Sequence, residues 1–262
     1  DEAEPATEGP RLYRDLLERA QREHELKIAA EIQRALLPQF CHRATAFEVA
    51  AMSVPCRAIG GDFFDYFNLT DGAFAFVLGD VAGKGPPAAL LAAVLQGIFT
   101  ANARRSLEPA AAISQANSAL VRRAIEARFA TVLYAVLEPD GRLVYCNAGH
   151  NPPILLSRSG VRRLEAGGLI IGAFEQATFE EDRLRLEPGD VLVAFSDGIT
   201  EARNADGEEF GEERLLSCVE ANRQRASEPL LECLLAEVRQ FSADTTQSDD
   251  LTVLVLRYSG EE

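Results

Sequence analysis

The apolar runs of this chain are short, and two pairs of them are joined by tight-turn sequences. The runs "FFDYFNL" and "AFAFVLGD" flank Asp71-Gly72, and "FATVLYAVLE" and "RLVYCNAG" flank Pro139-Asp140-Gly141. Gly adopts the positive φ that such turns need, and Pro presets the backbone of the first turn residue. Both stretches therefore predict β-hairpins, and hairpins indicate antiparallel sheets.

Helical segments come in pairs between the strands. The ranges from Pro86 to about Asn102 and from Pro109 to about Arg128 are rich in Ala and Leu, and two more helical segments fill about Glu212 to Phe241. The remaining predicted strands are "FEVAAMSV", "PPILLS", "VRRLE", "RLRLE", "DVLVAFSD" and "LTVLVLRY". Runs of strands with paired helices predict an α+β fold, in which antiparallel sheets carry the helices on their outer faces.

A long helix is predicted from Arg11 to Leu37. This range lacks Gly and Pro and repeats apolar residues at helical spacing until Pro38. The polar patch "QREHE" at 21–25 interrupts the apolar stripe, so a dimerising coiled coil and a helix that packs on its own domain both stay open. Residues 1–10 are acidic and contain Pro, which is typical of a disordered segment or a linker remnant. The chain thus divides into 1–10, a linker or regulatory helix at 11–37, and a folded domain at 38–260.

Charge and composition exclude several classes of function. The formal net charge is −15, which disfavours binding to nucleic acid or to an anionic membrane and suits divalent cations or basic partners. No apolar run reaches the ~18 residues of a membrane helix, and the acidic N-terminus is unlike a signal peptide. The five cysteines are scattered and form no C-x-x-C pair. They predict reduced thiols in a cytoplasmic protein, with no disulfide framework and no zinc knuckle.

The stretch "LGDVAGKGPPAALL" looks at first like a nucleotide-binding loop that runs into a helix. A P-loop needs G-x-x-x-x-G-K-[ST]. Here only three residues separate Gly79 from Gly83, and Lys84 is followed by Gly85. Nucleotide binding therefore becomes a weak alternative, which an ATP titration would test. Asp80 remains to be explained, because an ionised carboxylate at the end of an apolar strand is costly unless a positive charge meets it.

Asp80 is one of several acids that stand where an apolar run begins or ends. The set is Asp62 and Asp65 in "IGGDFFD", Asp80 in "VLGD", Asp197 in "VAFSDG", and Asp249 and Asp250 in "SDDLTVLVL". A single such Asp is common in turns and helix caps, but four motifs together indicate a shared cause. Oxygen ligands with few His and no paired Cys suit Mg²⁺ or Mn²⁺. Two such ions can activate a water molecule for displacement at phosphorus.

Five motifs, taken in order, resemble those of a known enzyme class. They are "IGGDFFD", "LGDVAGKG", "FATVLYAVLE…NAGHNPP", "VLVAFSDGITEARN" and "SDDLTVLVL". They resemble metal-dependent Ser/Thr protein phosphatases of the phosphatase-2C (PPM) class, and more narrowly its bacterial SpoIIE/RsbU-like branch. The resemblance covers roughly Ala29 to Tyr258. It implies a central antiparallel β-sandwich flanked by helix pairs in αββα layers, with the catalytic domain at 38–260 after the linker helix.

The resemblance also implies a site for two metal ions, with a third as an option. Its metal ligands would be Asp62, Asp80 as the bridging acid, the backbone carbonyl of Val81, Asp197 and Asp249, with Asp250 as the alternative to Asp249. Asp65 and Asp250 are otherwise candidates for supporting or capping roles. These residues would carry the reaction through metal-activated water.

Three further residues receive weaker roles. Arg57 lies five residues before Asp62, a place compatible with the phosphate-holding Arg of the wider class, although the SpoIIE-like branch does not reliably keep that residue. His150 is expected to fix the turn of "NAGHNPP". Lys84 is a candidate to lie near the phosphate, although a loop Lys is more often just solvated.

The implied reaction is hydrolysis of phosphoserine or phosphothreonine by Mn²⁺- or Mg²⁺-activated water, without a covalent intermediate. The implied substrate is a phosphorylated regulatory protein, typically a small anti-sigma-factor antagonist in bacterial partner switching. An N-terminal sensor or receiver domain is expected in the full-length protein, and a homodimer through the linker helix is a further expectation. The alternative is a non-catalytic partner-binding module of the same fold. Loss of one of the predicted metal-binding acids would indicate that alternative, and this sequence keeps all of them.

Overall fold

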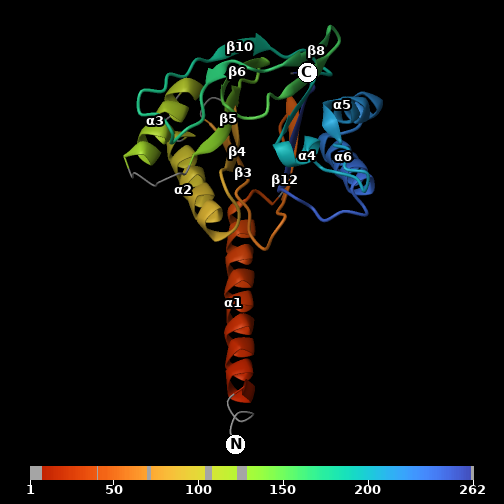
Figure 1. The fold of residues 1–262 in the computed structure, drawn as a ribbon. Coiled ribbons are helices and arrows are strands. Elements are labelled where there is room, and N and C mark those ends of the chain that lie inside the picture. The colour runs from red at the N-terminus through yellow and green to blue at the C-terminus, as the bar shows by residue number, and fades with distance from the viewer. Residues whose placement is uncertain (1–7, 40, 70–71, 104–107, 123–128, 261–262) are drawn as a thin grey trace, which may run out of the picture.

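The centre of the protein is a pair of facing β-sheets (Figure 1). The structure is a computed structural model that describes residues 8–39, 41–69, 72–103, 108–122 and 129–260. One sheet has the order β1-β2-β12-β11-β7-β8 and is antiparallel. The other has the order β10-β6-β5-β4-β3, with β9 parallel to β6.

The bounds of the elements follow. The strands are β1 (His42–Arg43), β2 (Phe47–Val54), β3 (Phe63–Asn68), β4 (Phe74–Val81), β5 (Ala130–Leu137), β6 (Arg142–Ala148), β7 (Ile154–Ser157), β8 (Gly160–Arg163), β9 (Gly167–Gly168), β10 (Asp182–Arg185), β11 (Val191–Phe195) and β12 (Leu251–Tyr258). The helices are α1 (Glu8–Leu36), α2 (Pro86–Ala103), α3 (Pro109–Val121), α4 (Asp197–Thr200), α5 (Gly211–Asn222) and α6 (Ser227–Phe241).

Helix pairs cover the outer faces of both sheets (Figure 1). The pair α2 and α3 packs on the β3–β6 sheet through a buried cluster that includes Phe99 and Tyr134. The pair α5 and α6 packs on the other sheet through a cluster that includes Phe195 and Leu234. A further cluster, with Leu254 among its members, fills the space between the sheets. The α+β fold with αββα layers, predicted from the sequence, is confirmed.

The two hairpins predicted from turn chemistry are present. β3 pairs with β4 in antiparallel register, and Gly72 in their connection has a φ of +79°. Its neighbour Asp71 lies outside the described residues. β5 pairs with β6, and Gly141 between them has a φ of +87°. The helix predicted to reach Arg128 is described as far as Val121, and residues 123–128 lie outside the described part.

Helix α1 forms a stem that extends away from the domain (Figure 1). It begins at Glu8, three residues before the predicted Arg11. The earlier start is allowed because Pro10 falls in the first helical turn, where a missing N–H costs nothing. Residues 1–7 lie outside the described residues. The C-terminal turns of α1 contact the domain, where Ala30 packs on Ile59 and Ala89.

Helix α2 is, among the described residues, the one helix long and apolar enough to cross a membrane by length and composition. Within its 18-residue window 44% is buried inside the domain. Its buried face belongs to the same apolar cluster as β4 and α3, which is the packing of a core helix.

Candidate metal centre

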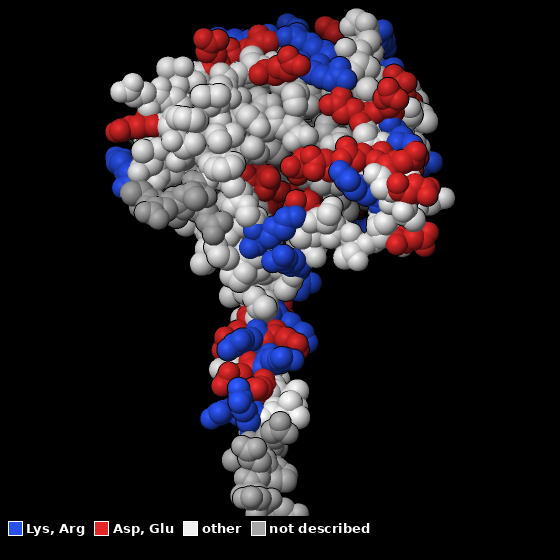
Figure 2. Space-filling view, in the orientation of Figure 1, with Lys and Arg blue, Asp and Glu red and all other residues white. Residues whose placement is uncertain are grey.

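The acids predicted as ligands gather where strands of both sheets begin or end. In one sheet, Asp62 directly precedes β3 and Asp80 is the penultimate residue of β4. In the other, Asp197 opens α4 shortly after β11, and Asp249 lies two residues before β12. Figure 2 shows acidic side chains gathered near the middle of one face, with Lys and Arg side chains below them toward the stem. Each sheet thus contributes carboxylates to one end of the sandwich.

These carboxylates are close enough to disturb one another's ionisation. Burial, and then the charges of Asp197 and Asp249, raise the pKa of Asp80 to about 6. Burial, followed by the charge of Asp80, raises the pKa of Asp62 well above its ordinary value. Burial and the charge of Asp249 also raise the pKa of Asp197. Such a group of like charges is relieved by bound cations.

Asp62 is the acid of the site whose side chain most clearly lacks a partner. Its side chain is buried, and its Oδ2 has no hydrogen-bond partner among the described residues. A buried carboxylate oxygen without a donor is costly. The side chains around Asp62 offer carboxylate oxygens, which are the ligands that hard divalent cations prefer. The residues present therefore fit Mg²⁺ or Mn²⁺.

Asp250, the alternative to Asp249, binds the loop that carries Asp62. Its Oδ1 accepts the backbone N–H of Cys56 at 2.8 Å. Its Oδ2 accepts the N–H of Gly61 at 2.8 Å and that of Asp62 at 3.3 Å. Three backbone N–H groups thus donate to Asp250, whereas Asp249 accepts a single backbone N–H, that of Asp250. The geometry therefore suits Asp250 to support of the loop better than to metal binding.

Asp249 faces a cation of the chain itself. Its Oδ2 lies 2.7 Å from Nζ of Lys84, which also donates to the carbonyl of Ser248 at 2.5 Å. Lys84 stands between Gly83 and Gly85, whose φ values are +100° and +77°, and this sharp turn carries it to Asp249. Of the two readings of Lys84, the merely solvated side chain is therefore wrong. Lys84 lies beside an acid of the site, and its contact with the phosphate stays a prediction.

Three other predicted residues lie around the acids. The carbonyl of Val81 faces Gly61, where an added Cβ would lie 2.7 Å from that oxygen. Arg57 is exposed in the loop between β2 and β3. Asp65 turns toward α2, where its Oδ2 accepts a hydrogen bond from Gln96 at 3.2 Å. Asp65 thus connects the sheet to a helix.

His150 is buried beside the strand that pairs with Asp80. Its Nδ1 lies 2.8 Å from Oγ1 of Thr131, the residue opposite Asp80 in the sheet. Its backbone N–H donates to Oδ1 of Asn147 at 2.7 Å, and Asn147 donates back to the His150 carbonyl at 3.0 Å. These paired bonds fix the turn, as the sequence predicts. Burial lowers the pKa of the imidazole to about 4, which keeps His150 neutral.

Helix α1 is bonded directly to the loop that carries Asp62. Nε2 of Gln33 donates to the carbonyl of Gly60 at 2.8 Å, and the N–H of Gly60 donates to Oε1 of Gln33 at 3.1 Å. An added Cβ at Gly60 would lie 2.1 Å from Oδ2 of Asp250, so the loop is held closely on both sides. Sequence analysis missed this link, because one Gln on a helix carries no motif.

Gln33→Ala is expected to lower the rate of the metal-dependent phosphoester hydrolysis that the motifs imply by about 10-fold. A loss of this size is typical when a residue that orients a metal ligand is removed. The reason is that the paired bonds hold Gly60, two residues before Asp62. The measurement is the rate as a function of Mn²⁺ concentration. Gln21→Ala is the matched control, because Gln21 bonds only to Glu25 on the exposed stem among the described contacts. Equal loss in both variants would contradict the role of Gln33.

Comparison with known proteins identifies the family of the chain. The sequence model of the family described as Stage II sporulation protein E (SpoIIE) matches residues 70–259. The chain belongs to the SpoIIE family. Among SpoIIE-like relatives, the chain is 28% identical to Protein IcfG of Synechocystis over 88% of its own length and 41% of the relative. It is 28% identical to the phosphoserine phosphatase RsbU of Bacillus subtilis over 89% of its own length and 70% of RsbU.

Solved structures show that the SpoIIE-family domain has the PP2C phosphatase fold. The PP2C domain of SiaA from Pseudomonas aeruginosa superposes with a TM-score of 0.79 at 21% identity, over 91% of this chain and 98% of that one. RsbX, solved in complex with magnesium, superposes with a TM-score of 0.62 at 17% identity, over 84% of this chain and 99% of RsbX. These likenesses concern the fold.

Proposed function

We propose that this protein is a metal-dependent phosphatase that hydrolyses phosphoserine or phosphothreonine on a regulatory protein. The observation that carries the proposal is the carboxylate cluster with the unpartnered Oδ2 of Asp62. Membership of the SpoIIE family and similarity to RsbU, a phosphoserine phosphatase, support it. The ligands would be Asp62, Asp80, Asp197, Asp249 and the carbonyl of Val81, holding two Mn²⁺ or Mg²⁺ ions.

In this mechanism the residues of the chain would hold the metal ions and keep the ligands correctly placed. Bound cations would supply the charge that activates water and neutralises the phosphate. Asp62 and Asp80 come from one sheet and Asp197 and Asp249 from the other, so the packing of the sandwich sets the spacing of the ligands. Asp250 and Gln33 restrain the loop of Asp62 from opposite sides. Such preorganised ligands spare the reaction the cost of reorganising them.

Hydrolysis of p-nitrophenyl phosphate with Mn²⁺, with Mg²⁺ and with excess EDTA tests the activity. We expect hydrolysis that depends on added metal, and a phosphoserine peptide should show the same dependence. Activity that persists in EDTA would contradict the mechanism. Absence of activity with every metal, in a folded protein that still binds Mn²⁺, would favour the non-catalytic partner-binding module.

Arg57→Ala is expected to raise KM for a phosphoprotein roughly 10-fold with little change in kcat, which corresponds to about 1.4 kcal/mol of binding. The exposure of Arg57 in the loop before β3 supports a contact with the substrate phosphate. Steady-state kinetics on a phosphoserine protein provide the measurement. Arg43→Ala, whose side chain faces Glu48 instead, is the matched control. Unchanged KM in Arg57→Ala would remove this residue from the site.

The partner that we infer is a phosphorylated anti-sigma-factor antagonist, met in the cytoplasm. The similarity to RsbU, a phosphoserine phosphatase, supports a protein that carries phosphoserine as the partner. The antagonist is the substrate that the resemblance to the SpoIIE/RsbU-like branch implies. The chain spans 41% of IcfG and 70% of RsbU, which fits a sensor or receiver domain elsewhere in the full-length protein. Leu12, Leu16 and Ile32 on α1 are 63%, 54% and 58% exposed, and they are candidates for a homodimer contact. Light scattering of the intact chain would measure that state.

A further inference from the structure

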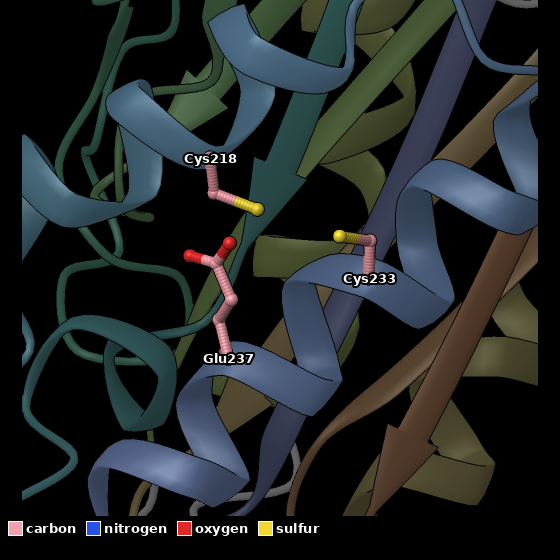
Figure 3. A group of neighbouring side chains, drawn as sticks. All are labelled: Cys218, Cys233 and Glu237. Carbon is pink, nitrogen blue, oxygen red and sulfur yellow. The ribbon is translucent and has the colours of Figure 1, made fainter.

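A second group of metal-binding side chains lies on the pair of helices α5 and α6, outside the acid cluster. Cys218 comes from α5, while Cys233 and Glu237 come from α6. The two Sγ atoms and a carboxylate oxygen all lie within 4.8 Å of one another. Figure 3 shows the two sulfurs directed toward one another, with the carboxylate of Glu237 beside Cys218. Three donors thus converge from two helices.

The spacing of these donors suits a single small ion. Cys233 and Glu237 are four residues apart, so they lie on the same face of α6 one turn from each other. Zn–S bonds are about 2.3 Å, so two thiolates on one tetrahedral Zn²⁺ lie about 3.8 Å apart. The observed limit of 4.8 Å leaves only side-chain adjustments between this arrangement and that geometry.

The three side chains of the cluster differ in how deeply they are buried. Cys218 is buried in the apolar cluster beneath the helices, Cys233 is half-buried and Glu237 is exposed. Glu237 also lines an open groove together with Arg214 and Phe241. The thiols are therefore shielded, while an ion can enter from the side of Glu237.

The inner thiol, that of Cys218, is buried beside the side chains of Glu237 and Cys233. Two thiolates and a carboxylate this close together are mutually compatible when they share a divalent cation, whose charge offsets theirs. Thiolate donors select soft or borderline ions, in contrast to the all-oxygen set around Asp80.

We propose that Cys218, Cys233 and Glu237 form a Zn²⁺ site with three protein ligands that ties α5 to α6. Binding of one Zn²⁺ deprotonates the two thiols and releases both protons to solvent, and the ionised carboxylate supplies the third bond. A water molecule completes the tetrahedral shell. The chain would then hold two kinds of metal site, one that selects hard ions between the sheets and one that selects zinc on the outer helix layer.

Zn²⁺ binding to the intact chain in the presence of excess Mg²⁺ and a thiol reductant tests the proposal. Mg²⁺ occupies the oxygen site and leaves the thiols free for Zn²⁺. We expect one bound Zn²⁺ per chain, a rise in Tm of about 5 °C, and a thiolate-to-metal charge-transfer band when Co²⁺ replaces Zn²⁺. Cys233→Ser should abolish the band and the rise in Tm, and Glu237→Gln should weaken binding at least 10-fold.

Cys41→Ser is the matched control, because Cys41 is also half-buried and hydrogen-bonded to a carboxylate, that of Glu228, but is absent from the cluster. This variant should keep the bound Zn²⁺ and the Co²⁺ band. Absence of stoichiometric Zn²⁺ in the wild type would overturn the proposal, as would full binding in Cys233→Ser. A Cys218–Cys233 disulfide in the freshly isolated, non-reduced protein would also overturn it. Phosphatase activity with Mn²⁺ should be the same in Cys233→Ser, so the outcome is independent of the proposed function.

Discussion

Asp80→Asn is expected to lower the Mn²⁺-dependent rate by more than about 100-fold. Loss of a partner that merely orients a ligand already costs 10- to 100-fold, and Asp80 is proposed as the acid shared by both ions. After burial, the charges of Asp197 and Asp249 are the largest causes that raise its pKa, so Asp80 lies close to acids of the other sheet. The amide has nearly the same shape but lacks the negative charge that a carboxylate would offer to a divalent cation.

The experiment compares p-nitrophenyl phosphate hydrolysis and Mn²⁺ binding in the wild type and the variant. Asp190→Asn is the matched control, because Asp190 is a buried carboxylate at the opposite end of β11, where its Oδ2 accepts the N–H of Glu187. Its rate per folded molecule should stay near that of the wild type. If Asp80→Asn hydrolysed the substrate at the wild-type rate, Asp80 would not be a metal ligand.

The hairpins and the helix layers could be predicted because their causes are local in the chain. Gly72 and Gly141 mark turns within a few residues of the strands that they join, and the observed φ values are positive at both. The short elements β1 and β9 could not be predicted, since each has two residues and pairs only with a strand already in place. The pairing of β12 with β2 joins residues about 200 apart, and no local pattern sets that register.

The acids of the site could be named from their motifs, but the division of labour between them could not. Asp249 and Asp250 are adjacent in the segment just before β12, yet their side chains meet different partners. Asp249 meets Lys84 and Asp250 meets the backbone of Gly61, and these partners come from distant parts of the chain that only the fold brings together. Cys218 and Cys233 illustrate the same limit, because their spacing in sequence is unlike any metal motif and only the packing of α5 on α6 unites them.

Asp250→Ala is expected to lower the free energy of unfolding by about 3 kcal/mol or more, and Asp249→Ala by about 1 kcal/mol. Removal of Asp250 strips three backbone N–H groups of a charged acceptor, and each such buried group costs about 1–3 kcal/mol. Asp249 loses an ion pair with Lys84, whose side chains are 38% and 36% exposed, and one hydrogen bond from the N–H of Asp250 at 2.9 Å. The exposed pair contributes little, so the loss in Asp249→Ala is essentially that of one hydrogen bond, against three in Asp250→Ala.

Urea unfolding in EDTA, where bound metal contributes nothing, measures both free energies. Mn²⁺ titration of the same proteins should rank them in the opposite order, with the larger loss of affinity in Asp249→Ala, because that carboxylate is the proposed ligand. Asp249→Ala as the less stable protein, or Asp250→Ala as the weaker Mn²⁺ binder while still folded, would exchange the two assignments. In either case, the free energy of unfolding and the Mn²⁺ affinity together distinguish the role of Asp249 from that of Asp250, which the sequence motif does not do.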